Sequence, residues 1–546
     1  MKQVTSEELY VILRTNETIS NIHVGNYTLN WSVLYKQGIT GLKSFNNCVF
    51  DNLKIEGLIE EETVFIKCQF NLLHIAASGD STSVKLGNCI IETLSVSSFK
   101  GSDNLDLLHI TGKDSSIDKI SINRGVRVLR IEDANVSHST IFSEDDRCEI
   151  DYIDSTIGDI SIHGKIRSVG FHKAMISHIR MKSLDLRSHI IFDSCDVDSC
   201  QLYGVKSTTL LSKSSSHKQF IFHSAIIEEV TLVSPIKIDM LNISKECSLV
   251  LHNLFEDGSA NTLMIGELKF WNLDLDSKSL FNFNRVNFEN VRLMDTVNDG
   301  IIKLRDCSIG ANFNLLSSEV NDLRFNTVTI GQNCKVSIID TDISDVRFNN
   351  FKWGNDYALL EKYDPEIHGT NKNLFYLTLR ESYRQLKSLF IKNGNKIEAL
   401  EFQKHELRAH YLLVKRDTFN DGVSGFFRNL GNFLILWTHK SASNFGLHIW
   451  KPFILLFIFH AIFFNVFLIS NDLGYQFSLE NDPDVFAHAC KDYFYTLWPT
   501  HGFSMKSIES VDVNISGLSD ILLRVFSGYF IFYFVTASRK YHGSGS

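Results

Sequence analysis

The segment Ile190–Gly204, "IIFDSCDVDSCQLYG", contains the pattern that decides the fold of the N-terminal part of the chain. It alternates apolar and polar residues, places a small residue after two polar ones, and then alternates again. Val64–Ile75 ("VFIKCQFNLLHI") and Val84–Val96 ("VKLGNCIIETLSV") follow the same pattern, which recurs about every 20 residues. A repeat of this length predicts a solenoid.

Alternating runs of Ile, Val, Phe and Leu, separated by Asn, Asp, Ser and Gly, predict short strands joined by turns. The sequence therefore predicts an irregular right-handed β-helix of about 20 residues per coil over residues 42–362, with residues 1–41 as an N-terminal cap. Cysteine at the small position is expected to pack as a compact apolar side chain rather than to bind metal. The small position is occupied by Cys48, Cys68, Cys89, Ala134, Ser155, Ala174, Cys195, Ala225 and Cys307.

These coils are similar to pentapeptide-repeat solenoids, whose four five-residue sides also total twenty residues, although the strict A-(D/N)-L-x-x pattern is absent. Some parallel β-helices are polysaccharide lyases or hydrolases that gather carboxylates on one face. Here the odd and even spacing of Asp193, Asp196 and Asp198 scatters them across both faces of a strand. We therefore expect no enzyme activity, no metal site and no cofactor.

Composition and the N-terminus suggest a cytoplasmic solenoid. The net charge is −9 and no long basic run occurs, so no nucleic-acid partner is expected. Residues Met1–Ser20 lack a continuous apolar run, so no signal peptide is predicted and the solenoid is expected to stay in the cytoplasm. Residues 543–546, "GSGS", are interpreted as an added linker.

A helical hairpin is predicted as a connector over residues 363–418, where the apolar period changes from two to that of a helix. Asn393-Gly394-Asn395 supplies the turn between its two helices. The motif "YRQLK…NGNKIEALEFQKHELRAHY" resembles a connector in bacterial membrane proteins that joins pentapeptide-like repeats to a two-helix, channel-like segment. The predicted apolar faces are Leu379, Tyr383, Leu386 and Phe390 in the first helix, and Ile397, Leu400, Leu407 and Tyr411 in the second.

The last part of the chain, residues 449–542, is predicted to be a two-transmembrane domain. Ile449–Ser470 is 22 residues long with one formal charge, Lys451, and Gly517–Ser538 is the second predicted span. Asp520 and Arg524 in that span are four residues apart and able to pair on one helix face. Residues 419–448 are predicted to form an interfacial helix on the inner leaflet, with a third crossing as the alternative.

Lysine and arginine predict the orientation of these spans. They gather before the first span and after the second, whereas the intervening loop is mainly acidic. The positive-inside rule then places both termini in the cytoplasm. The resemblance of the connector to bacterial membrane proteins implies that this membrane is a bacterial inner membrane.

The loop between the spans contains Tyr495–Ser504, "YTLWPTHGFS". This order of elements resembles the potassium-channel fold, in which a pore helix precedes a Thr-Val-Gly-Tyr-Gly filter in a re-entrant loop. The resemblance implies a pore helix over residues 485–498. The filter positions would then be Thr500, His501, Gly502, Phe503 and Ser504, of which His501 and Ser504 depart from the filter pattern.

The leading hypothesis is an oligomeric ion channel or pore in the membrane lipid, controlled by the solenoid as a sensor of a protein trigger. A bacterial stress response or a phage defence is a compatible setting. The alternative is a membrane-anchored scaffold, whose solenoid binds a protein partner and whose two spans conduct nothing.

Overall fold

The computed structural model describes residues 1–37, 39, 43–58, 62–97, 105–124, 126–144, 146–234, 236–255, 263–275, 277–354, 359, 372–420, 422–445, 448–470, 483–499 and 515–542. The chain divides into two units, Met1–Leu360 and Glu361–Ser546. The first unit is a β-solenoid with coils of about 21 residues, and the second is helical.

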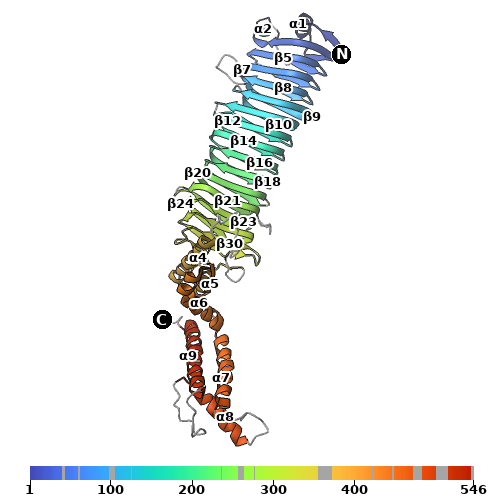
Figure 1. Cartoon of the computed structure of the whole chain (residues 1–546). Coiled ribbons are helices and arrows are strands. Elements are labelled where there is room, and N and C mark those ends of the chain that lie inside the picture. Colours follow the sequence, from blue (N-terminus) through green and yellow to red (C-terminus); the bar gives the residue numbers. More distant parts are fainter. Residues whose placement is uncertain are drawn as a thin grey trace. The chain divides into compact units, whose positions relative to one another are not determined.

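The strands of the solenoid stack coil upon coil (Figure 1). They are β1 (Lys2–Val4), β2 (Thr18–Ser20), β3 (Ile22–Asn30), β4 (Lys43–Asn46), β5 (Val49–Leu58), β6 (Thr63–Ile66), β7 (Gln69–Gly87), β8 (Ile90–Ser97), β9 (Leu105–Asn123), β10 (Val126–Ser143), β11 (Glu149–Ile153), β12 (Thr156–Ile166), β13 (Ser168–His172), β14 (Met175–Leu186), β15 (His189–Asp193) and β16 (Asp196–Tyr203). They continue with β17 (Lys206–Lys213), β18 (Ser216–His223), β19 (Ile226–Ser234), β20 (Lys237–Phe255), β21 (Leu263–Leu275), β22 (Leu280–Asn284), β23 (Val286–Met294), β24 (Val297–Asn298), β25 (Ile301–Arg305), β26 (Ser308–Leu316), β27 (Glu319–Val320), β28 (Leu323–Asn326), β29 (Thr329–Ile330), β30 (Lys335–Ile339) and β31 (Arg347–Asn349).

Neighbouring strands pair in parallel, each with the equivalent strand of the next coil. Tyr152 of β11, Phe171 of β13 and Phe192 of β15 occupy one position in three successive coils. Their rings stack at 5.5 and 5.2 Å between centroids. Because each coil repeats the register of the last, identical inward positions form continuous buried columns, which is how a narrow solenoid obtains a core.

Between Ile190 and Leu232 the buried residues follow a five-residue period. The spacing between successive buried positions alternates between two and three residues, with Ser199 as an additional buried residue. Strands in this stretch pair with strands 20 residues further along the chain, so the coil length that the sequence predicts is confirmed here. The buried positions are Ile190, Phe192, Cys195, Val197, Cys200, Leu202, Val205, Ser207, Leu210, Ser212, Ser215, His217, Phe220, Phe222, Ala225, Ile227, Val230 and Leu232.

The coils turn at residues with left-handed backbone conformation, and many of these are followed by an inward small residue. Polar residues tolerate this conformation at single positions, and Ser194, with φ of 58°, precedes Cys195 in this way. The Ser194 amide donates to the Lys213 carbonyl of the next coil at 2.9 Å, so the turn itself joins the ladder. The same conformation precedes each of the nine predicted small positions, at Asn47, Lys67, Asn88, Asp133, Asp154, Lys173, Ser194, Ser224 and Asp306.

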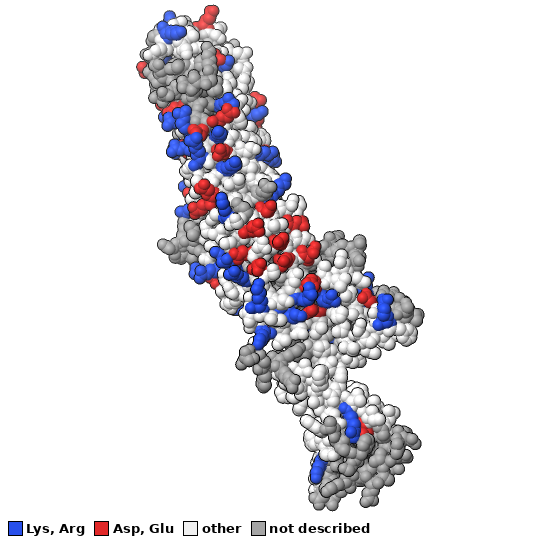
Figure 2. Space-filling model, turned by 90° about the vertical axis from the view of Figure 1, so that its left-hand side faces the viewer, with Lys and Arg blue, Asp and Glu red and all other residues white. Residues whose placement is uncertain are grey.

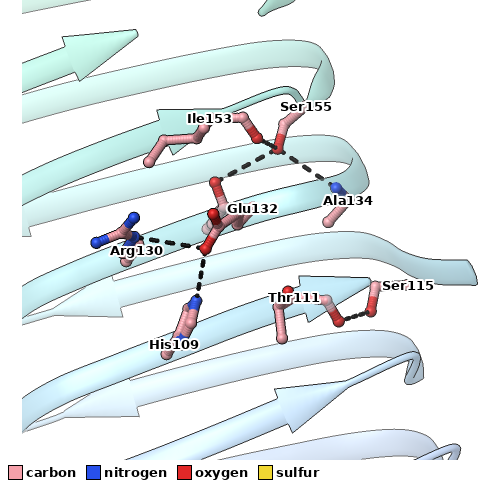
Figure 3. Close-up of polar contacts among 9 residues, drawn as sticks. His109, Thr111, Ser115, Arg130, Glu132, Ala134, Ile153 and Ser155 are labelled. Carbon is pink, nitrogen blue, oxygen red and sulfur yellow. Dashed lines mark hydrogen bonds and ion pairs between the residues drawn. The ribbon is translucent and has the colours of Figure 1, made fainter. Parts of the chain in front are cut away.

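The small residues also form hydrogen bonds at these turns. Figure 3 shows Ser155 Oγ accepting from the Ala134 amide at 3.4 Å and donating to the Ile153 carbonyl at 2.8 Å. Cys195 Sγ donates in the same way to the carbonyl two residues before it. All nine predicted small positions are buried, which confirms them, but Ala225 belongs to a second column of turns, where its amide meets Cys247 Sγ.

The first coil lies within the residues predicted to be a cap. Strands β1 and β3 pair with each other, and β3 pairs with β5, so the ladder begins at Lys2 rather than at residue 42. Two helices, α1 (Ser6–Thr15) and α2 (Trp31–Lys36), are inserted into this coil. Helix α1 buries Leu9 and Leu13, and Thr5 with Glu8 forms a capping box at its start.

The second unit begins with an antiparallel hairpin of α4 (Lys372–Lys392) and α5 (Lys396–Asn420). Gly394, at φ of 76°, provides the left-handed turn that the sequence predicts. The predicted face of the first helix is confirmed, since Leu379, Tyr383, Leu386 and Phe390 are all buried.

The predicted face of the second helix is wrong at its start. Ile397 is 73% exposed, and the residues of α5 that are buried in the hairpin include Ala399, Phe402 and Ala409. Phe402 stacks on Phe390 of α4 at 5.4 Å.

Helix α6 (Gly422–Ser443) follows and packs against α5. Leu436 of α6 and Tyr411 of α5 form a small buried cluster with Phe445. Phe427 and Ile435 remain 71% and 65% exposed, so α6 presents apolar side chains outward as well as toward α5. The remaining helices are α7 (Trp450–Ser470), α8 (Pro483–Thr496) and α9 (Ile515–His542).

Candidate functional site

Helices α7 and α9 are the two described helices that are long and apolar enough to cross a membrane, over Trp450–Phe467 and Asp520–Ser538. They pack antiparallel, since Phe453 meets Phe534 and Phe463 meets Phe526. Only 28% and 22% of the two segments are buried, so most of their apolar surface faces outward. Figure 2 shows few charged side chains on the visible part of this region. Helix α6 is not among the described helices that are long and apolar enough to cross a membrane.

Helix α8 packs by its C-terminal end against the middle of α7. Tyr493 Oη donates to the Phe457 carbonyl at 3.1 Å, and Thr496 Oγ1 lies 3.3 Å from His460 Nε2. The Tyr493 ring stands perpendicular to the His460 ring at 4.5 Å. His460 and Thr496 are 2% and 1% exposed, so this polar contact is enclosed by apolar side chains.

The position of this contact along α7 corresponds to mid-membrane depth. His460 is ten residues after Trp450, which is about 15 Å along an α-helix. A bilayer core is about 30 Å thick. If α7 spans a bilayer, the C-terminal end of α8 therefore reaches roughly half of its depth.

The segment after α8 approaches α9 as well. A side chain on Gly528 would meet the Pro499 ring, whose Cγ lies 3.7 Å from the position of an added Cβ. Leu497 packs in the cluster that contains Leu456 of α7 and Phe530 of α9. Helix α8 and the residues after it are thus held by both long helices.

The polar pair singled out in the sequence is in contact. Arg524 Nε donates to Asp520 Oδ2 at 2.7 Å, and the Asp520 side chain is 4% exposed. The two charges compensate each other within one helix, which lowers the cost of placing them among apolar residues. Ser527 lies further along α9, 1% exposed, and its hydroxyl has no hydrogen-bond partner within the described residues.

The five filter positions Thr500, His501, Gly502, Phe503 and Ser504 lie outside the described residues. The predicted pore helix over residues 485–498 corresponds to α8, which begins two residues earlier and ends at Thr496. The sequence interpretation missed His460, Tyr493 and Gly528. An ionisable residue in the middle of a long apolar helix was the available signal for His460.

Two of the aspartates considered in the sequence of the solenoid form ion pairs with basic side chains. Asp198 pairs with Lys218, and Asp193 pairs with His172 at 3.7 Å. No group of three or more potential metal ligands occurs among the residues that the structure describes. Burial raises the pKa of the Cys195 thiol to about 11.

Figure 3 shows a typical surface cluster of the solenoid, in which Glu132 meets His109 at 3.1 Å and Arg130 at 3.6 Å. The His109–Glu132 contact joins adjacent coils, and such pairs between neighbouring strands contribute to the stability of the ladder. The candidate functional site of the chain is therefore the helical assembly of α7, α8 and α9. In comparisons with known proteins, no family model, no curated protein and no solved structure matches the chain.

Proposed function

We propose that the chain is an integral membrane protein whose α7–α8–α9 segment forms an ion-conducting pore together with copies of itself. In this proposal α7 and α9 cross a bacterial inner membrane, α8 is the pore helix, and residues 500–504 line the narrow part of the pore. Both termini and the solenoid lie in the cytoplasm, where the solenoid senses a protein trigger, as in a stress or phage-defence response.

The main support for the proposal is that the C-terminal end of α8 packs against the middle of α7. A helix that only connected two anchors would lie in the water or at the headgroups. Here Tyr493 and Thr496 instead bond to Phe457 and His460 in the middle of α7. A helix C-terminus carries a partial negative charge, so α8 in this position favours a cation near its end.

The exposed surface of the long helices supports assembly in lipid. Isoleucines and a valine follow one face of α7, at Ile454, Ile458, Ile462 and Val466, each between 43% and 54% exposed. In water this surface would be unstable, whereas in a bilayer it contacts lipid or a second copy. One copy with two spans cannot enclose a pore, so the proposal requires a cyclic oligomer.

The second candidate function is a membrane-anchored scaffold. It is favoured by the Asp520–Arg524 contact, because two opposite charges that neutralise each other within one helix do not require a water-filled pore beside them. In this case the solenoid binds a protein partner and the hairpin conducts nothing.

Ion flux from liposomes containing the purified full chain tests the first candidate. We expect flux above protein-free vesicles, with Gly502→Ala and His501→Ala changing its rate or ion selectivity. Gly431→Ala is the matched control, because an added Cβ there meets open space in α6. Unchanged currents in both loop variants would exclude residues 500–504 as the pore lining, and absence of flux under every trigger condition would favour the scaffold.

A further inference from the structure

A cavity of about 540 Å³ lies at the start of α7, and its lining combines two chemistries. Asn444, His448 and Lys451 provide polar and cationic groups at one side. Ile454 and Leu455, one turn further along α7, provide an apolar side. Such a lining fits a ligand with an anionic head and an apolar tail.

Lys451 of this cavity belongs to a group of cations that act on Lys440, four residues before Asn444. Lys440 Nζ lies over the Tyr411 ring, 4.5 Å from its centre, rather than beside a carboxylate. Burial lowers the pKa of Lys440, and Arg408, Lys415 and Lys451 lower it further through their positive charge. Lys440 therefore lies close enough to three other cations to be repelled by them, and within the described residues no ion pair involves Lys440. An anion bound among them would relieve this repulsion.

The apolar side of the cavity continues along α7. Ile454 is the first residue of the exposed face that runs on through Ile458 and Ile462 to Val466. These residues span twelve positions, or about 18 Å of helix. An extended acyl chain covers a similar length, and β-branched side chains at every fourth residue provide a continuous track for it.

We propose that this cavity binds an anionic phospholipid, with the phosphate between His448 and Lys451 and one acyl chain along Ile454, Ile458 and Ile462. The inference rests on the proposed function in one respect, that α7 crosses the bilayer with its start at the cytoplasmic leaflet. Basic pockets at this level are the general means by which membrane proteins select anionic headgroups. The site would couple the lipid to α6, whose end forms the cavity wall.

Lipid binding by the detergent-solubilised full chain tests the proposal, measured by native mass spectrometry and by the thermal shift on adding lipid. We expect phosphatidylglycerol to bind and stabilise, and phosphatidylcholine with the same chains to have little effect. Lys451→Gln should weaken phosphatidylglycerol binding roughly fivefold, from the loss of one cation near the headgroup. Adding His448→Gln should weaken the binding further, because a hydrogen-bond donor to the phosphate is lost. Lys182→Gln is the matched control, because Lys182 is exposed on the solenoid.

Three results would overturn the lipid site. The first is equal binding of the two lipids, and the second is equal retention of phosphatidylglycerol by the double variant and by Lys182→Gln. The third is that soluble glycerol phosphate stabilises the chain as much as phosphatidylglycerol does, which would identify a site for free phosphate. Washing membranes that contain the chain at high pH distinguishes failure of the lipid site from failure of the proposed function. Release of the wild-type chain would refute membrane spanning, whereas a retained chain without lipid preference would refute the lipid site alone.

Discussion

At the scale of single residues, many polar groups in the interior of the solenoid find a hydrogen-bond partner in the coil stack. Ser155 bridges backbone groups of two coils, and buried cysteines such as Cys195 donate to carbonyls in the same positions. Thr63, Asn298 and His217 differ, because each is buried with a side-chain polar atom that has no partner in the described part of the chain. At His217 this atom is Nδ1, while Nε2 meets Ser212 Oγ at 3.0 Å. Phe192 and Phe220 enclose the ring.

His217 should make the solenoid sensitive to acid. Burial lowers its pKa to about 4 from an ordinary value of 6.5. As pH falls below 6.5 the unfolded chain binds a proton at this residue and the folded chain does not, so stability is lost progressively until pH reaches about 4. Between pH 7 and pH 5 we expect a loss of roughly 2 kcal/mol from this residue, measured by urea unfolding of the full chain in detergent.

The variant His217→Leu with Ser212→Ala removes both partners and should have a smaller loss of stability between pH 7 and pH 5 than wild type. His138→Gln controls for histidines on the surface, since the His138 side chain is 60% exposed. Equal pH dependence in wild type and the double variant would show that His217 is not the cause.

At the scale of elements, the apolar periodicity of a helix predicts correctly which of its residues are buried when the helix packs against one neighbour. Helix α4 packs on α5, and its four predicted residues are buried. Helix α5 has two neighbours, with Phe402 against α4 and Tyr411 beside Phe433 of α6. Because α5 has two contact faces, its apolar residues do not form one stripe. A prediction that assumes a single stripe therefore puts Ile397 wrongly on the buried face.

The hydroxyl of Thr496 should hold α8 in place. Thr496→Val keeps the volume and removes the contact with His460, and it should lower stability by about 1 kcal/mol because a buried polar group loses its partner. The measurement is the thermal midpoint of the detergent-solubilised chain, together with ion flux, which should fall. The control is Thr536→Val on α9, where the hydroxyl bonds within its own helix to the Phe532 carbonyl. A loss no larger than that of the control would mean that α8 is seated by apolar packing alone.

At the scale of the whole molecule, a β-solenoid of repeated coils is joined to a helical unit with a large apolar surface. The two units obtain stability differently: the first from stacking equivalent coils, and the second from the environment of its outer helices. We therefore expect the second unit to need lipid, detergent or further copies of the chain.

Oligomer size in mild detergent should therefore be a small fixed number greater than one. A pore of the potassium-channel kind requires four copies. Light scattering of the purified full chain, corrected for bound detergent, measures the protein mass of the particle. A strict monomer at all concentrations would contradict the pore and leave the scaffold as the function.

Sequence alone determined the solenoid, its small inward positions, the hairpin turn at Gly394 and the two apolar helices. These features depend on local alternation, on helical period and on length, each of which is written in consecutive residues. Tertiary structure alone decided that the ladder starts at Lys2, that Ala225 belongs to a second column, and that α8 bonds to the middle of α7. Those facts depend on contacts between residues far apart in the chain, such as Thr496 with His460, for which the sequence contains no periodic signal.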